Sequence, residues 1–263
     1  MQPFEAAEAN LRAAMRCYAR CTPLGEVREH PGLVLTSSGV NFSVFNSAML
    51  TAPVKTPQEL ELRIATAKVY FRQRGLQWSF WVCVELLDSQ TRRYLPDLFR
   101  RANLRMVAEP PGLVAEELAA PVRPLPDLDI LPILDSRTRC DFALLSNQVF
   151  RLPMPIANAI YAPESTWNGP MTGYIGYLYG DPVSILATVV SDGVIGIYSV
   201  GTVGAYQRHG FAERLVRHAI EDQAPRNGSC RSALQSTEAG LRLYRKLGYR
   251  QATQFAIFVD ESR

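Results

Sequence analysis

The chain has 263 residues, of which 47% are hydrophobic and 20% charged, and its formal net charge at pH 7 is only +3. This composition is typical of a folded globular protein, and the length allows one large domain or two of ordinary size. Because the net charge is small and the arginines are dispersed, there is no electrostatic case for nucleic-acid binding. No apolar run is long enough to cross a bilayer, so we expect no membrane partner.

The N-terminus and the cysteines indicate the compartment. The first residues, with Glu5 and Glu8, lack the basic and apolar regions of a signal peptide. The five cysteines are scattered and odd in number. Cys17 and Cys21 lie on one predicted helix, but no His or Cys pair completes a zinc site. We therefore expect a soluble cytoplasmic protein with free thiols and no bound metal.

Local signals predict alternating helices and strands in the first half of the chain. Ser37-Ser38-Gly39 predicts a hairpin turn between two strands. Thr56-Pro57-Gln58-Glu59 is a capping box with proline at the first helical position, and the helix that it begins ends at Gly75. In chain order we expect a helix at 4–21, hairpin strands within 33–45, a helix up to 75, a strand at 78–84, a short helix at 96–103 and a strand near 104–108.

The second half is predicted to contain a sheet that leads into a helix. A helix at 136–150 precedes a long loop at 152–170, and loops of that length are usually functional or mobile. Strands at 174–179 and 183–190 follow, and Ser191-Asp192-Gly193 makes a tight hairpin into the next strand. The expected fold class is α/β (α+β), with a mixed, mostly antiparallel sheet flanked by helices.

The segment 194–212 is predicted to form a strand, a glycine-bearing turn and the start of a helix. From Phe211 onward the apolar residues recur with helical spacing. The free amides at such a helix start, together with the helix dipole, bind phosphate groups. The segment contains neither a P-loop nor the Gly-x-Gly-x-x-Gly pattern of dinucleotide-binding folds.

Two motifs in this half resemble signatures of one family. Gln207-Arg208-His209-Gly210-Phe211-Ala212 has the pattern Gln/Arg-x-x-Gly-x-Gly/Ala, which resembles the pyrophosphate-binding loop of the GCN5-related N-acetyltransferase (GNAT) superfamily. The stretch from Gly240 to Tyr249 is similar to the family's second signature, a helix that ends in aromatic-Tyr-x-x-Leu-Gly-Phe/Tyr, with Leu243 at the aromatic position. A predicted helix and a strand at 230–234 join the two, as in the family. The resemblance covers residues 171–263.

The resemblance implies a GNAT fold with acetyl-coenzyme A (acetyl-CoA) as cosubstrate. The loop amides would hold the pyrophosphate, and Arg208 would add a side-chain contact, whereas the His209 side chain is expected in solvent. Main-chain groups of Val200 and Val203 would contact the pantetheine arm where two strands splay apart. Ser236 lies where relatives contact the cofactor, with a plain N-cap as the alternative. The cofactor-binding residues expected are Val200, Val203, Gln207, Arg208, His209, Gly210, Phe211, Ala212 and Ser236.

The resemblance also suggests a catalytic residue. Tyr244 lies where many relatives keep a tyrosine hydroxyl near the thioester sulfur, so we expect it to protonate the leaving thiolate; a packed aromatic side chain is the alternative. Acids positioned in this way contribute about 10²–10⁴-fold to a rate. Many relatives also carry a glutamate on the strand equivalent to 195–200, but here that strand has no carboxylate. The general base therefore stays unassigned.

The first half follows a shortened version of the element order in the second half. We therefore expect a tandem arrangement, with a degenerate GNAT-like domain at 1–120 and the catalytic domain at 121–263; an unrelated α+β domain is the alternative. Residues 109–132 are rich in proline and should form an ordered crossover. The first half lacks the loop pattern and should not bind coenzyme A. Substrate selection would fall to a groove between the halves. The candidate lining residues, with core packing as the alternative for each, are Asn41, Phe42, Phe45, Asn46, Trp78 and Trp81.

These features predict an N-acetyltransferase that transfers the acetyl group of acetyl-CoA to a primary amine of a small molecule by direct attack in a ternary complex. Two alternatives stay open. One is a non-catalytic acyl-CoA-binding sensor or regulatory module, motivated by the missing carboxylate. The other is an acyltransferase that uses a longer acyl chain or a peptide acceptor. We expect a monomer or a homodimer without a nucleic-acid partner.

Overall fold

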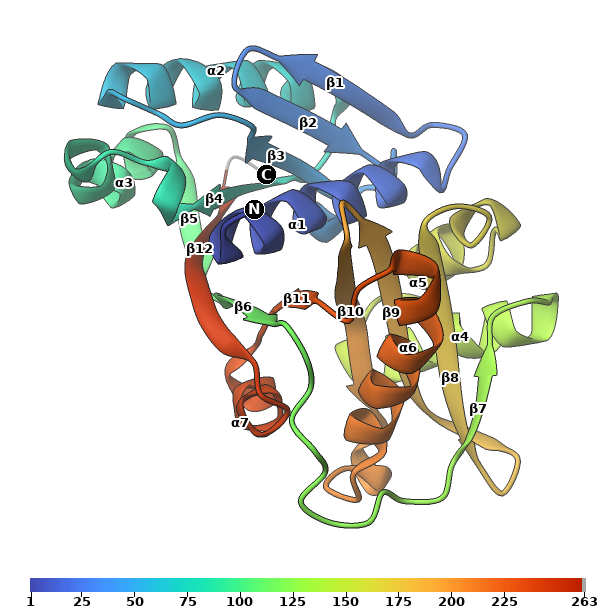
Figure 1. The fold of residues 1–263 in the computed structure, drawn as a ribbon. Helices are drawn as coiled ribbons and strands as arrows, with labels where there is room; N and C mark the ends of the chain where they lie inside the picture. The colour runs from blue at the N-terminus through green and yellow to red at the C-terminus, as the bar shows by residue number, and fades with distance from the viewer. Residues whose placement is uncertain (262–263) are drawn as a thin grey trace.

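The computed structural model describes residues 1–261 and contains one continuous mixed sheet with helices on both faces (Figure 1). The strand order is β1-β2-β3-β4-β12-β6-β11-β10-β9-β8-β7, and β5 pairs with β12. Neighbouring strands are antiparallel except for the pairs β3–β4 and β10–β11. The predicted fold class is confirmed.

The helices are α1 Pro3–Arg20, α2 Pro57–Arg74, α3 Ser89–Arg101, α4 Ser136–Phe150, α5 Met154–Tyr161, α6 Phe211–Asn227 and α7 Glu238–Lys246. The strands are β1 Glu26–His30, β2 Leu33–Ser37, β3 Asn46–Leu50, β4 Ser79–Cys83, β5 Leu104–Ala108, β6 Pro111–Ala115, β7 Asp129–Pro132, β8 Met171–Leu178, β9 Asp181–Ser191, β10 Val194–Thr202, β11 Ser232–Gln235 and β12 Arg250–Asp260.

The two halves of the chain follow the same order of elements. In the first half, β1, β2 and β3 form an antiparallel meander, α2 crosses over to the parallel strand β4, and α3 leads to β5. In the second half, β8, β9 and β10 form the meander, α6 crosses over to the parallel strand β11, and α7 leads to β12. The position of the domain boundary at residue 120 remains a prediction.

The halves exchange their last strands. β6 follows β5 in the first half, but it inserts between β11 and the first part of β12, which both belong to the second half. In return, the last residues of β12 pair with β4 and β5. Because each exchanged strand covers what would otherwise be an unpaired edge, the two sheets become one.

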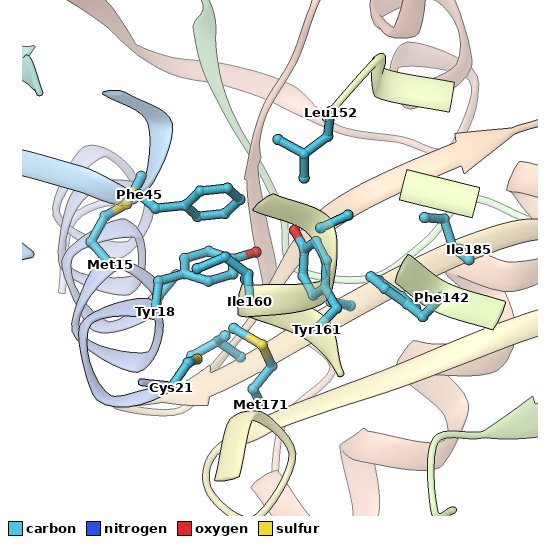
Figure 2. Close-up of a cluster of buried hydrophobic side chains, with 14 of the residues drawn as sticks. Met15, Tyr18, Cys21, Phe45, Phe142, Leu152, Ile160, Tyr161, Met171 and Ile185 are labelled. Atoms are coloured by element: carbon cyan, nitrogen blue, oxygen red, sulfur yellow. The ribbon is translucent and has the colours of Figure 1, made fainter. Parts of the chain in front are cut away.

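Helix α1 lies between the two halves (Figure 1). Side chains from α1, from the first-half sheet and from α4 and α5 form a shared core, part of which is drawn in Figure 2. Here the Tyr18 ring contacts Phe45 edge-on at 5.2 Å between centroids, and the Phe142 ring lies 4.9 Å from Tyr161. A separate core under α2 and α3 stabilises the first half, and another under α6 and α7 stabilises the second. Among the described helices, none is both long and apolar enough to cross a membrane.

Most of the predicted helices and strands are confirmed, and their ends have the expected local causes. The Thr56 hydroxyl accepts a hydrogen bond from the Glu59 amide at the start of α2, and Gly75 ends the helix with φ 68°. Asp192 and Gly193 make the predicted hairpin between β9 and β10 with positive φ angles of 50° and 75°. Gly228 ends α6 in the same left-handed conformation, with φ 69°.

Two predictions about helices were wrong. The short helix placed at 96–103 is α3, which begins seven residues earlier because the Asp88 carboxylate caps the amides of Gln90 and Thr91; Pro96 lies inside it. The loop predicted at 152–170 contains α5, since proline in the first turn of a helix removes an amide that would have no partner there. Pro225 likewise lies inside α6, and the helix ends at Gly228.

Two predictions about strands also need correction. Residues 37–39 do not form a tight turn between two strands, because β2 ends at Ser37, a 3₁₀ turn occupies Ser43–Phe45, and β3 starts only at Asn46. Strand β1 was missed, since its residues are polar and mostly exposed. Residues 109–132 contain two short strands, β6 and β7, in addition to the crossover.

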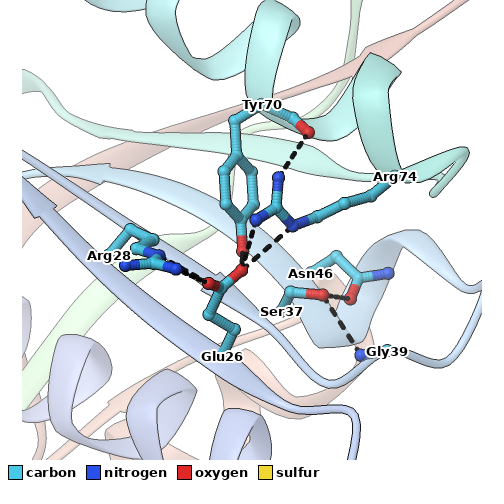
Figure 3. A network of polar contacts seen from close by, with 7 residues as sticks. All are labelled: Glu26, Arg28, Ser37, Gly39, Asn46, Tyr70 and Arg74. Carbon is cyan, nitrogen blue, oxygen red and sulfur yellow. Dashed lines mark hydrogen bonds and ion pairs between the residues drawn. The ribbon is translucent and has the colours of Figure 1, made fainter.

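The side chain of Asn46 explains the wide connection between β2 and β3. It is fully buried, and its Nδ2 donates to the carbonyls of Val40, Phe42 and Gln77 at 2.7, 3.2 and 2.8 Å. Its Oδ1 accepts from the Ser37 hydroxyl at 3.1 Å (Figure 3). One side chain thus satisfies carbonyls that a strand pair would otherwise bond.

A second polar group in Figure 3 attaches β1 to α2. The Glu26 carboxylate accepts hydrogen bonds from the Tyr70 hydroxyl at 2.8 Å and from Arg74 Nη2 at 2.6 Å, and it also pairs with Arg28. Although partial burial opposes it, these hydrogen bonds hold the pKa of Glu26 below its usual value. Because the pairs are partly exposed, each stabilises the fold only modestly.

We expect Asn46→Ala to destabilise the protein by about 2–4 kcal/mol, because it leaves several buried carbonyls without donors. Urea unfolding measures this change. Asn41→Ala is the matched control, since the exposed Asn41 accepts one hydrogen bond from the Gln77 amide at 2.7 Å. It should cost about 1 kcal/mol or less. Equal losses for the two variants would contradict the structural role given to Asn46.

Candidate active site

Strands β10 and β11 separate soon after they start. Their parallel register includes only Ile195 opposite Ser232 and Gly196 opposite Ala233. Beyond Gly196, β10 continues along β9 alone, while β11 continues along β6. The opening expected at Val200–Val203 therefore starts already after Gly196. It leaves a gap between two strands at the centre of the sheet.

A bulge in β10 lies beside this gap. The register with β9 shifts between Tyr198 and Gly201, so that Ser199 and Val200 share one position opposite the partner strand. Ser199 has a positive φ of 49°, which is strained for a residue with a side chain. The hydroxyls of Tyr18 and Tyr161 lie 3.4 and 3.3 Å from its Oγ. Burial raises the pKa of both tyrosines, so their hydroxyls stay protonated.

The loop after β10 presents the start of α6. Arg208 and Gly210 have positive φ angles of 68° and 95°, and α6 begins at Phe211 with Gly210 as its N-cap and without a side-chain cap. Its first amides are therefore free of the usual capping side chain, and they carry the positive end of the helix dipole. The Gln207 side chain instead donates to the Thr202 carbonyl at 3.2 Å. His209 stacks on Phe211 with ring centroids 5.9 Å apart.

The crossover between the halves passes beside this loop. A Cβ placed on Gly210 would lie 3.1 Å from Arg123 Nη2 and 3.3 Å from Pro126. Further back, the crossover contacts the end of α7, where the Ala119 amide donates to the Leu247 carbonyl at 2.9 Å. Arg123 is exposed and adds a guanidinium next to the loop. Sequence reasoning missed it, because no local pattern ties residue 123 to residue 210.

Not every expected cofactor contact is equally available. The Val203 amide donates to the Val183 carbonyl at 2.9 Å, and the Val203 carbonyl accepts from the Tyr206 amide at 2.8 Å. Both main-chain groups of Val203 are therefore already used within the protein. Val200 lies in the bulge, outside the regular pairing with β9. Of the two valines, the main chain of Val200 is the better placed for a ligand.

Ser236 directly follows β11, and Tyr244 lies on α7. A Cβ on Gly240 would meet the Tyr244 ring at 3.0 Å and Ser236 Oγ at 3.3 Å, so the two side chains share one corner at the start of α7. Both are buried, at 7% and 1% exposure. Burial raises the pKa of Tyr244, so its hydroxyl is a proton donor at neutral pH. The N-cap of α7 is Thr237, whose side chain accepts from the Gly240 amide, and not Ser236.

The aromatic residues suggested for a substrate groove mostly belong to cores. Trp78 is 2% exposed and stacks on Phe71 at 4.8 Å between ring centroids, within the first-half core. Phe45 is buried in the core between the halves. Trp81 is only partly buried and packs edge-on against Phe255. Within residues 1–261, no group of three or more His, Cys, Asp or Glu side chains is arranged to hold a metal ion.

Comparisons with known proteins agree with this geometry. Residues 147–249 match the sequence model of the Acetyltransferase (GNAT) family. Among solved structures, the chain is similar to a GCN5-related N-acetyltransferase from Kribbella flavida, with a TM-score of 0.75 and 18% identity over 100% of this chain and 97% of that one. A putative GNAT-family acetyltransferase from Novosphingobium aromaticivorans gives a TM-score of 0.56 and 15% identity over 100% and 98% of the two chains. No curated protein matches the sequence significantly.

The structure thus contains a parallel strand pair that separates and an uncapped helix start. The family match assigns a GNAT acetyltransferase domain to residues 147–249. The structural neighbours share the fold over both halves of the chain. The recognition made from the two sequence motifs is thereby confirmed.

Proposed function

We propose that the protein transfers an acetyl group from acetyl-CoA to a primary amine of a small molecule. Three features support the proposal: the separation of β10 and β11 after Gly196, the start of α6 without a side-chain cap, and the buried Tyr244 next to Ser236 at the start of α7. Two of these come from motifs that are far apart in the sequence. The first half lacks a comparable loop and serves to complete the sheet and to cover the site.

The residues present fit the cosubstrate. The first amides of α6 and the dipole of the helix favour a pyrophosphate, and Gly210 at φ 95° lets the backbone approach it without a side chain in between. Arg208 and Arg123 would add positive charge on two sides of the loop. Such charge-assisted hydrogen bonds to phosphate are about twice as strong as neutral ones. The edge of β10 at Val200 would accept the pantetheine arm.

When bound, acetyl-CoA supplies an activated thioester. The protein would hold the amine next to it, because positioning two reactants supplies much of the rate of such a transfer. Tyr244, kept protonated by burial, would donate a hydrogen bond or a proton to the sulfur as the thiolate leaves. Ser236 lies in the same corner and would orient this part of the cosubstrate.

A specific observation keeps one other function open. Strand β10 has the sequence VIGIYSVGT, which contains no carboxylate to act as a base. A coenzyme A-binding sensor without turnover would need none. A transferase for longer acyl chains or peptides is the third candidate. The three functions predict different results in one assay.

The test is release of free thiol from acetyl-CoA in the presence of a panel of primary amines: alkylamines, arylalkylamines, polyamines, amino sugars and amino acids. We expect one class to give turnover well above the rate of thioester hydrolysis, and mass spectrometry to show the acetylated amine. Tight binding without turnover of any amine would favour the sensor. A strong preference for acyl chains longer than acetyl, in the same assay, would favour the third candidate.

A further inference from the structure

Glu8 is a buried carboxyl group with an unusual lack of hydrogen bonds. It lies on α1 and is 5% exposed. Its Oε1 is 2.9 Å from Arg12 Nε, but within residues 1–261 neither atom has a partner in hydrogen-bonding geometry. Because burying a carboxylate is costly unless it is fully bonded, a group of this kind needs an explanation.

The turn of α1 that carries Glu8 crosses the gap between β10 and β11. On one side of the turn, Gln235 Nε2 at the end of β11 donates to the Ala7 carbonyl at 3.3 Å. On the other side, the hydroxyl of Tyr198, which is the last β10 residue before the bulge, donates to Asn10 Oδ1 at 2.7 Å. The turn from Ala7 to Asn10 therefore contacts both strands where they have separated, and Glu8 lies within this turn.

This turn lies on the face of the sheet away from α6. Ile195 and Ile197 of β10 pack in the core that α6 shares, whereas Gly196 between them faces Asn10. The cosubstrate's phosphates are proposed to bind at α6, so α1 covers the opposite side of the opening. An amine that enters between the two halves would reach the thioester from this side.

The groups around Glu8 come from three elements. Arg12 and Arg16 on α1 lower its pKa, but burial outweighs them and raises the pKa to about 7. Burial, with a smaller contribution from the negative charges of Glu85 and Glu8, raises the pKa of the Cys83 thiol on β4 to about 12. The Cys83 Sγ lies 3.2 Å from the Thr253 hydroxyl of β12, which donates to the exposed Glu85. Cys83 therefore stays a neutral thiol near pH 7.

We propose that Glu8 is the general base of the transfer and that the acceptor amine binds on the α1 side of the opening between β10 and β11. The inference rests on the proposed function. The ammonium nitrogen loses one proton to the Glu8 carboxylate, directly or through one water. Its lone pair then forms the C–N bond to the thioester carbon. The C–S bond breaks with its electron pair on sulfur, and sulfur gains one proton as nitrogen loses its second. Glu8 afterwards releases its proton to solvent.

The experiment measures kcat and KM against pH for the wild type and for Glu8→Gln, with the most active amine of the panel. The wild-type kcat should rise with pH and level off above about pH 7, because the base must be ionised. This rising part of the profile is the pH limb. In Glu8→Gln we expect kcat at pH 7.5 to fall by about 10²-fold and the limb near pH 7 to disappear, with an unchanged KM for acetyl-CoA. Glu8→Asp should restore part of kcat together with a limb.

Thermal unfolding separates a catalytic role from a structural one. A carboxyl group whose pKa is raised in the folded state lowers stability as the pH rises through that pKa. Glu8→Gln should therefore unfold at pH 8 at a temperature no lower than that of the wild type. A purely structural Glu8 would give the reverse, a lower midpoint with an unchanged pH limb.

Glu85→Gln is the matched control, since Glu85 is the other carboxylate of this cluster, 3.6 Å from Cys83. It should keep the limb near pH 7. If Glu85→Gln loses the limb, or if Glu8→Gln keeps wild-type kcat, the assignment to Glu8 is overturned while the acetyltransferase function stands. If the wild type binds acetyl-CoA but acetylates no amine, the proposed function itself fails, and this inference fails with it.

Discussion

Gly210→Glu should abolish the stabilisation that acetyl-CoA gives to the wild-type protein. Gly210 has φ 95°, and a Cβ there would lie 3.1 Å from Arg123 and at the start of the α6 amides. A glutamate would place a negative charge where the pyrophosphate is proposed to bind. A ligand at 100 times its dissociation constant stabilises by about 2.7 kcal/mol. In a protein of this size that raises the unfolding midpoint by roughly 5–10 °C, and the variant should show no rise.

Gly193→Glu controls for the strain of adding a side chain at positive φ. Gly193 has φ 75° and no atom within 4 Å of the added Cβ, and it lies in the hairpin at the opposite end of β10. Both variants should lose some intrinsic stability. Only Gly210→Glu should lose the response to acetyl-CoA. An unchanged response in Gly210→Glu would place the cosubstrate elsewhere in the fold.

Tyr244→Phe should lower kcat by about 10²-fold or more while leaving stability nearly unchanged. The Tyr244 side chain is buried, and its raised pKa keeps the hydroxyl protonated. Phenylalanine keeps the ring and its edge-on contact with Tyr249, so the change in unfolding free energy should stay within about 0.5 kcal/mol. The loss appears only when a thiolate must leave. Steady-state kinetics and urea unfolding of the same sample measure the two effects.

Tyr249→Phe is the control, and it should lower stability while leaving kcat unchanged. Its ring contacts Tyr244 edge-on at 5.6 Å, and its hydroxyl bonds Ser232 Oγ at 2.7 Å in the core. Removal should cost about 1 kcal/mol of stability, because a buried hydroxyl loses its partner, and should leave kcat close to that of the wild type. Equal kcat values for Tyr244→Phe and the wild type would assign Tyr244 to packing alone.

Local sequence signals predicted those parts of the protein whose structure depends on near neighbours. The cap at Thr56, the left-handed Gly75 and the hairpin at Asp192–Gly193 all follow from interactions within a few residues. The loop from Gln207 to Ala212 is of the same kind, because a strand, a glycine turn and a helix start are contiguous. The start of α3 after Asp88 and the helix α5 at Met154, which were both missed, also carried local signals: an Asp N-cap and a proline in the first turn.

The tertiary structure determined how these local elements are placed relative to one another. The exchange of β6 and β12 follows from strand pairing between residues more than a hundred positions apart, for which a single sequence holds no pattern. The placement of Arg123 beside Gly210 and of the α1 turn from Ala7 to Asn10 across the gap between β10 and β11 arises in the same way. The sequence alone determined the strand, the glycine turn and the helix start in which the GNAT resemblance was recognised, because adjacent residues build that loop. Only the packing of the crossover onto the sheet decided that Arg123 lies beside the loop, because hydrophobic burial brings distant segments together without leaving a local trace.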